Sequence, residues 1–212
     1  MSELTAVPES VKPRVGFLGP AELGRQLLDS LAGSGLAEVV GIAVGSADAV
    51  REAAPAPAVA PAAVHAALDE LLDRGLDGVV IATPDALHAE PATRALERGV
   101  AVFCQAPLAR TASETRAVID VARAADRLLA VDLPYRHTEA MRALQPVVQS
   151  GELGEVYAVD VVFHGAHGPE RGWARDARLA GGGCVLDLGL HVLDLALWTL
   201  GFPRVTSVTS RL

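Results

Sequence analysis

Short apolar runs alternate with longer amphipathic segments through the first 130 residues, and this alternation restricts the fold more than any other feature. Five runs are expected to be buried strands because they are apolar on both faces and rich in β-branched residues: 15–18, 39–43, 78–82, 101–104 and 128–131. Parallel strands need crossovers of a dozen or more residues, usually helical. The sequence therefore predicts the α/β fold class, with a doubly wound parallel (Rossmann) sheet.

The segments between these runs carry apolar residues at helical spacing. They predict helices over 22–31, 47–53, 64–72, 86–97 and 113–125. The stretch from Ala53 to Ala63 holds three prolines, which forbid a continuous helix there. It is interpreted as an extended surface crossover inside the domain, with a linker between domains as the alternative.

The pattern changes after Asp132. A helix over 138–149 ends at Ser150-Gly151, a long strand is expected over 156–163, and a polar loop fills 165–183. A further helix over 186–200 precedes a second strand at about 204–210. The predicted organisation is an N-terminal tail (1–13), a dinucleotide-binding domain (14–133) and an incomplete α/β C-terminal domain for substrate binding and oligomerisation (134–212).

Charge and composition exclude several function classes. The net charge of −8 repels phosphate backbones and anionic lipid, so nucleic acid is not an expected partner. No apolar run reaches the length of a membrane span, and the start of the chain lacks the apolar segment of a secretory signal. Cys104 and Cys184 have no CxxC spacing, which favours a reduced, cytoplasmic setting.

A glycine-containing turn follows the first predicted strand and opens a helix. Gly19, Ala21 and Gly24 occupy the three positions of a GxGxxG pattern, in which close backbone approach receives a dinucleotide pyrophosphate at a helix N-terminus. A plain strand-to-helix turn is the alternative. At the end of the next strand, Ser46 stands where a carboxylate usually binds the ribose. The predicted cofactor is therefore NAD or NADP, without a preference between them.

Several longer blocks carry a family resemblance: DGVVIATPDALHAEPATRALERGVAVFCQAPLA, LLAVDLPYRH, SGELGEVYAVDVVFHG and GGGCVLDLGLHVLDLALWTLGFP. Together they resemble the Gfo/Idh/MocA family of NAD(P)-dependent sugar and polyol oxidoreductases, over residues 14 to about 210. The resemblance implies hydride transfer between a nicotinamide and a sugar carbon. It also implies a C-terminal sheet that often makes subunit contacts, hence a possible homo-oligomer.

The same resemblance implies a nicotinamide site at two loops. Thr83 and Pro84 would line the nicotinamide, and Gln105 and Pro107 belong to a block that is Glu-Lys-Pro in the family. Ala106 replaces the family's lysine, which binds a substrate hydroxyl and favours the developing alkoxide. No displaced lysine is available from the core, since Lys12 is the only lysine in the chain.

The last block supplies the acid/base candidates. Asp187, His191 and Asp194 share one helical face, so His191 is the expected catalytic acid/base and Asp187 the carboxylate that orients it. The alternatives are a helix-dipole role for Asp187, a buried structural His191, and an arginine pair for Asp194. Tyr135, Arg136 and Asp194 are the substrate-binding candidates. No metal is expected, because His164 and His167 lack a third ligand.

These observations predict an NAD(P)-dependent oxidoreductase acting on a sugar, polyol or related small molecule, with impaired activity. One alternative is a catalytically silent nucleotide- or ligand-binding relative of the family. Another is a truncated product that folds poorly. Because two predicted C-terminal strands bury little apolar surface, self-association through 156–163 or poor solubility is expected.

Overall fold

A six-stranded parallel sheet forms the centre of the computed structural model, which describes residues 12–19, 22–43, 63–65, 68–83, 85–164 and 182–211. The strands are β1 (Arg14–Leu18), β2 (Glu38–Ala43), β3 (Ala63–His65), β4 (Gly78–Ile81), β5 (Ala101–Gln105) and β6 (Leu129–Asp132). Their order is β3-β2-β1-β4-β5-β6, and every neighbouring pair is parallel. The doubly wound Rossmann sheet predicted from the sequence is confirmed.

One strand was not expected. Residues 64–72 were predicted as a single helix, but Ala63–His65 pairs with β2 and the helix α3 covers only Leu68–Leu72. This part of the prediction is wrong because pairing with an existing sheet edge decides the state of so short a segment, which periodicity cannot reveal. The predicted helix over 47–53 lies outside the described residues.

The remaining helices of the first half follow the predicted pattern closely. They are α1 (Glu22–Ser34), the short 3-10 turn η2 (Asp85–Leu87), α4 (Ala89–Glu97) and α5 (Ala112–Ala124). The start of α5 is fixed by its N-cap, because the Thr111 side chain accepts a hydrogen bond from the Glu114 backbone N–H.

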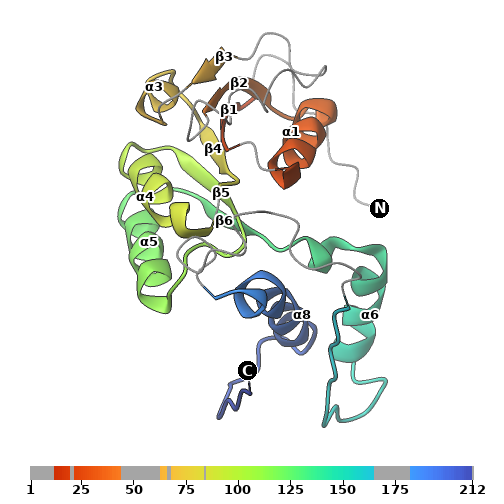
Figure 1. Cartoon of the computed structure of the whole chain (residues 1–212). Coiled ribbons are helices and arrows are strands. Elements are labelled where there is room, and N and C mark those ends of the chain that lie inside the picture. The colour runs from red at the N-terminus through yellow and green to blue at the C-terminus, as the bar shows by residue number, and fades with distance from the viewer. Residues whose placement is uncertain are drawn as a thin grey trace.

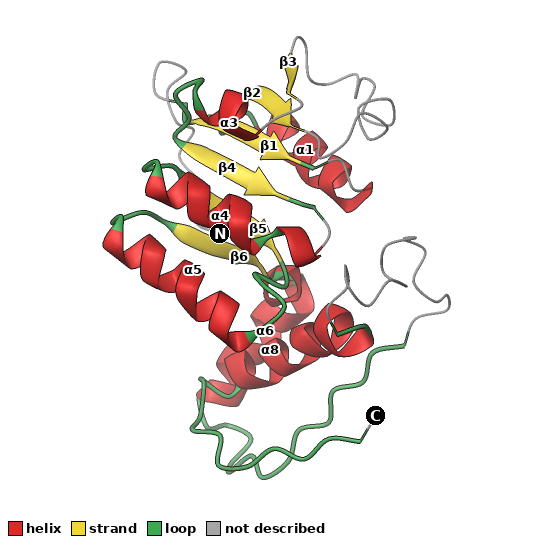
Figure 2. Ribbon diagram, turned by 60° about the vertical axis from the view of Figure 1, so that its left-hand side comes forward, coloured by secondary structure: helices red, strands yellow, loops and turns green. Residues whose placement is uncertain are grey.

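Helices cover the two faces of the sheet unequally. Figures 1 and 2 show α4 and α5 on one face and α1 on the other. Successive side chains of β5 point to opposite faces of the sheet. Val102 and Cys104 belong to the core beneath α4 and α5, and Phe103 packs against the smaller apolar cluster beneath α1. The α1 helix packs over β1 and β2 (Figure 2). The part of this sheet face that lies toward β6 is therefore less covered by helix.

The regular elements of the second half are all helical in its described part. It contains the 3-10 turn η3 (Pro134–His137), α6 (Glu139–Gln149), the single π-type turn η5 (Val185–Gly189) and α8 (Leu190–Thr199). In both views α6 and α8 lie beyond the β6 end of the sheet. The predicted helices over 138–149 and 186–200 are therefore present.

The two strands predicted in the second half are absent. Segments 156–163 and 204–210 run as loops with exposed side chains. The alternating apolar residues of 156–163 fit a sheet face, but a strand needs a hydrogen-bonded neighbour, and none of the described segments provides one to either segment.

Candidate active site

The order of strands reverses at β1 and β4, whose carboxyl ends form the switch point where doubly wound folds bind ligands. Gly19 follows β1 there with a φ of +97°, a left-handed conformation that favours glycine. A Cβ on Gly19 would stand 2.8 Å from Thr83 Cγ2 and 2.9 Å from the Ala82 carbonyl oxygen. The close packing of this turn against the end of β4 therefore requires glycine at position 19.

Two loops at this edge are fastened together by His88, which is fully buried at the start of α4. Its Nδ1 lies 2.6 Å from the Pro107 carbonyl oxygen and its Nε2 lies 2.7 Å from the Thr83 carbonyl oxygen. Burial lowers the pKa of His88, while the two carbonyl contacts act in the opposite direction. His88 therefore has a structural role, and it joins the loop after β4 to the loop after β5.

Gln105 ends β5 as a buried polar residue. Its side-chain Nε2 has no hydrogen-bond partner among the described residues. Ala106 follows it, half-buried, and Pro107 is buried. In register, Gln105 is paired with Asp132, the last residue of β6, so the two residues end adjacent strands at the same edge.

His191 is brought to this edge by α8. Its ring lies edge-on to Tyr135, with centroids 5.1 Å apart, and Tyr135 also packs edge-on against Phe163 at 5.6 Å. Burial raises the pKa of the half-buried Asp132, and the nearby charges of His191 and His137 partly offset that rise. His191 is therefore near enough for its charge to act on Asp132, a carboxylate that the sequence did not single out.

Arg136 and Asp194 bind each other. The Arg136 guanidinium donates from Nε to Asp194 Oδ2 at 2.7 Å and from Nη2 to Asp194 Oδ1, and it lies 5.4 Å from the centre of the Phe202 ring. This is the arginine pair considered for Asp194 as the alternative to substrate binding. The pair fastens α8 to η3 and thereby fixes the position of His191.

Asp187 lies in the π-type turn η5 and is exposed. Within the described part of the chain its side chain makes no hydrogen bond, and none connects it to His191. The spacing does place both residues at the start of the same helical segment. A role for Asp187 as the carboxylate that orients His191 therefore stays a prediction.

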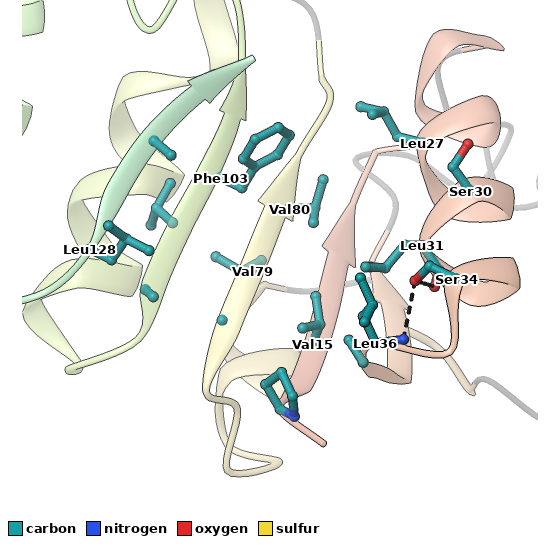
Figure 3. A pocket seen from close by; sticks show the side chains of 16 residues that line it. Val15, Leu27, Ser30, Leu31, Ser34, Leu36, Val79, Val80, Phe103 and Leu128 are labelled. Carbon is teal, nitrogen blue, oxygen red and sulfur yellow. Dashed lines mark hydrogen bonds between the residues drawn. The ribbon is translucent and has the colours of Figure 1, made fainter. Parts of the chain in front are cut away.

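A pocket of about 540 Å³ lies elsewhere, between α1 and the sheet face that α1 leaves partly open (Figure 3). Val15, Val79, Phe103 and Leu128 contribute to its apolar lining, and no ionisable side chain contributes to it. Several of these residues belong to the amino-terminal halves of their strands. The pocket is therefore separate from the carboxyl edge and lacks the groups needed for hydride or proton transfer.

Three predicted cofactor contacts, Ala21, Ser46 and Pro84, lie outside the described residues, and Gly24 lies in the first turns of α1. Asp132 was missed because an aspartate that ends a strand has the same sequence pattern as a solvated turn residue. Within the described ranges there is no group of three or more His, Cys, Asp or Glu residues able to hold a metal ion. In those ranges, no helix has both the length and the apolar character needed to span a bilayer.

Comparison with known proteins identifies both parts of the chain. Residues 13–133 match the family model described as "Oxidoreductase family, NAD-binding Rossmann fold", and residues 141–212 match the GFO/IDH/MocA C-terminal domain. The predicted cofactor class is thus confirmed at the level of the family.

Individual relatives act on sugars. The chain is 36% identical over 135 residues to D-glucoside 3-dehydrogenase of Escherichia coli. This alignment covers 63% of this chain and 38% of that protein. It is 34% identical over 192 residues to dTDP-3,4-didehydro-2,6-dideoxy-alpha-D-glucose 3-reductase of Streptomyces violaceoruber, covering 89% of this chain and 54% of the relative. The structure of levoglucosan dehydrogenase in complex with NADH and levoglucosan matches with a TM-score of 0.74 and 26% identity, over 90% of this chain and 55% of that one. The chain spans about half the length of the relatives it matches, or less.

Proposed function

This chain belongs to the Gfo/Idh/MocA oxidoreductase family, and on that premise we propose that it transfers a hydride between a nicotinamide dinucleotide and a carbon of a sugar, polyol or related hydroxylated molecule. The observation that carries the proposal is the meeting of two kinds of group at one sheet edge. Gly19 and Thr83 pack closely together at the switch point, where doubly wound folds bind dinucleotides, and His191 lies beyond β6 at the same edge.

The residues present fit a dinucleotide. Gly19 follows β1 in a left-handed conformation, and α1 is the next described element along the chain. The N-terminal N–H groups of a helix at this edge attract phosphate. Thr83, Gln105 and Pro107 flank the next part of the edge, which we assign to the nicotinamide end. When bound, the nicotinamide supplies the hydride acceptor or donor.

The chain's own residues supply the proton chemistry. In the oxidation direction His191 takes the proton from the reacting hydroxyl as the hydride leaves the carbon, and in reduction it returns a proton to the oxygen. Tyr135 holds the imidazole by its edge contact, and the Arg136–Asp194 pair keeps α8 in place. His88 keeps the loops carrying Thr83 and Pro107 at a fixed separation. Asp187, at the start of the same helical segment, is proposed as the carboxylate that orients His191.

Sugars are the proposed substrate class because relatives named for D-glucosides, levoglucosan and a dideoxyglucose derivative match this chain. A hydroxyl-rich substrate also fits an edge that carries histidine, carboxylate and amide groups.

Ala106 favours a second candidate function, a family relative that binds a dinucleotide or sugar without turnover. The cation expected from the family pattern is missing at this position, and a lost electrostatic contact of that kind costs on the order of a hundredfold in rate. We therefore propose that turnover by the natural sequence is slow.

A fluorescence titration with NADH and with NADPH tests the cofactor part of the proposal. We expect binding in the micromolar range or weaker, and a Gly19→Ala variant, checked for folding by circular dichroism, should bind at least about tenfold less tightly. Gly33→Ala is the matched control, because a Cβ there meets nothing within 4 Å. If neither NADH nor NADPH binds, or if Gly19→Ala and Gly33→Ala lose the same amount of affinity, the proposed function is contradicted. Binding without sugar oxidation would favour the second candidate.

A further inference from the structure

A buried hydrogen-bond donor without an acceptor lies at the carboxyl end of β5. The Gln105 side chain is 5% exposed, and its Nε2 has no partner among the described residues. Buried polar groups are nearly always hydrogen-bonded, because losing water without gaining another partner costs free energy. The exception at the edge that carries the proposed active site indicates that a ligand supplies the acceptor.

An acceptor without a donor ends the neighbouring strand. Asp132 is the register partner of Gln105, and alternation puts the two side chains on the same face, in phase with Phe103 and Ala130. The Asp132 carboxylate is half-buried and makes no side-chain hydrogen bond within the described part of the chain. It also lies near enough to His191 for their charges to interact.

We propose that Gln105 and Asp132 together bind one hydroxyl group of the substrate, next to the hydroxyl that His191 deprotonates. The Gln105 Nε2–H donates to the hydroxyl oxygen, and the hydroxyl O–H donates to the Asp132 carboxylate. A hydroxyl both donates and accepts, so it satisfies both groups at once. This proposal rests on the proposed function for the class of ligand, and it assigns to the Gln105 amide a contact separate from the cofactor role of its loop.

The charge and hydrogen-bonding capacity of the pair select against other ligand groups. A carboxylate or phosphate would be repelled by Asp132, and an ammonium group, which has no acceptor, would leave the Gln105 donor without a partner. A neutral hydroxyl meets neither penalty. The pair therefore favours a neutral polyhydroxylated ligand that presents two hydroxyls close together, one at His191 and one between Gln105 and Asp132.

Binding of defined sugars tests this arrangement. The probes are methyl α-D-glucopyranoside and its 2-, 3-, 4- and 6-deoxy analogues, measured by calorimetry on the full chain in the presence of NADH. We expect one deoxy analogue to bind the unaltered chain about tenfold more weakly than the parent sugar. In Gln105→Met the parent should weaken by a similar factor, and the same deoxy analogue should lose nothing further.

Asp132→Ala provides the second half of the test. It should single out the same missing hydroxyl as Gln105→Met, because one hydroxyl group touches both side chains. Gln26→Met is the matched control, since Gln26 is an exposed amide on α1, and it should bind all five sugars like the unaltered chain. Different hydroxyls for Gln105 and Asp132, a uniform loss for all five sugars, or no sugar binding at millimolar concentrations would overturn the proposal.

Thermal unfolding of the chain without ligands gives an independent readout. Because the Gln105 donor has no partner inside the described chain, Gln105→Met should unfold at the same temperature as the unaltered chain or higher. A fall of more than about 3 °C would mean that the amide is satisfied within the protein, and would overturn the assignment. If NADH binds but no single deoxy sugar binds more weakly than the others, only the proposed Gln105–Asp132 hydroxyl site is rejected. If one deoxy sugar does bind more weakly but NADH does not bind, only the proposed hydride transfer is rejected.

Discussion

The sheet half of the chain (residues 13–133) and the second half (134–211) differ in how their apolar side chains are used. Every fully buried apolar side chain among the described residues lies between Phe17 and Ala122. In the second half Tyr157 is 97% exposed and Val208 is 83% exposed. Among the described residues of that half, Thr199 alone is buried. The comparison teaches that the sheet half completes its own core, whereas the second half is held to it by a few specific contacts.

The candidate site lies where these two halves meet. Gly19, Thr83, Gln105 and Asp132 lie at the carboxyl ends of strands of the sheet. His191 lies on α8, which is held by contacts with η3. The cofactor edge therefore depends on the packed core, and the acid/base group depends on the lightly held helix.

Truncating one leucine in each half to alanine is expected to give the largest difference between the two halves. Leu96 on α4 is fully buried and Leu193 on α8 is 56% exposed. We expect Leu96→Ala to lower the free energy of unfolding by about 2–5 kcal/mol, because it leaves a cavity in the core. Leu193→Ala should cost less than about 1 kcal/mol. Urea denaturation measures both, and similar losses would mean that the second half is packed as tightly as the first.

The two thiols report the same contrast chemically. Burial, and secondarily the charge of Asp85, raises the pKa of the Cys104 thiol, while Cys184 is exposed at the start of η5. At neutral pH we expect iodoacetamide to label Cys184 at least about 100-fold faster than Cys104, because Cys104 needs an opening of the core before it can react. Mass spectrometry of digested samples follows both sites. Comparable labelling rates would contradict the burial of the sheet half.

His88 extends the comparison to the loops of the site. Replacing it with Gln should cost about 1–3 kcal/mol, because the carbonyls of Thr83 and Pro107 lose a rigid partner. His137→Gln, on the exposed η3 turn, is the control and should cost little.

The pH dependence of His88 follows from its lowered pKa. Below about pH 6.5 the unfolded chain binds a proton at His88 that the folded chain does not, so stability falls as the pH falls, by up to about 1.4 kcal/mol per pH unit. The slope difference between the unaltered chain and His88→Gln isolates this contribution. Identical slopes would show that the buried ring titrates normally.

The smallest effect concerns the pair that fastens α8. The side chains of Arg136 and Asp194 are 24% and 11% exposed, so a double-mutant cycle with Arg136→Gln and Asp194→Asn should give a coupling of about 1 kcal/mol. The exposed pair of Arg123 and Asp120 on α5 is the control and should couple by less than about 0.5 kcal/mol. Equal couplings would leave the attachment of α8 unexplained.

The sequence predicts five of the six strands of the sheet half well because each of the five is apolar on both faces, so pattern and burial agree. It fails at Ala63–His65, where three residues become a strand only by pairing with β2. It also fails at 156–163, where an alternating pattern has no neighbour to pair with among the described segments. Local patterns do not encode partners that come from elsewhere in the chain.

The site divides in the same way. Gly19 is predictable because its strand-to-helix turn is a local motif, and Thr83 is predictable because the family resemblance marks its loop. The proximity of Asp132 to His191 is not, because it depends on how α8 docks through Arg136 and Asp194, far away in the sequence.

The central claim is that His191 performs proton transfer at the edge formed by β5 and β6, and a rate measurement on three chains tests it most directly. NADH formation from NAD and levoglucosan would be followed for the unaltered chain, for Ala106→Lys and for Ala106→Lys combined with His191→Gln. We predict slow or undetectable turnover, a rise of about a hundredfold with the added lysine, and loss of that gain without the histidine. A gain that survives His191→Gln, or no gain in the lysine variant that binds NADH normally, would contradict the assignment.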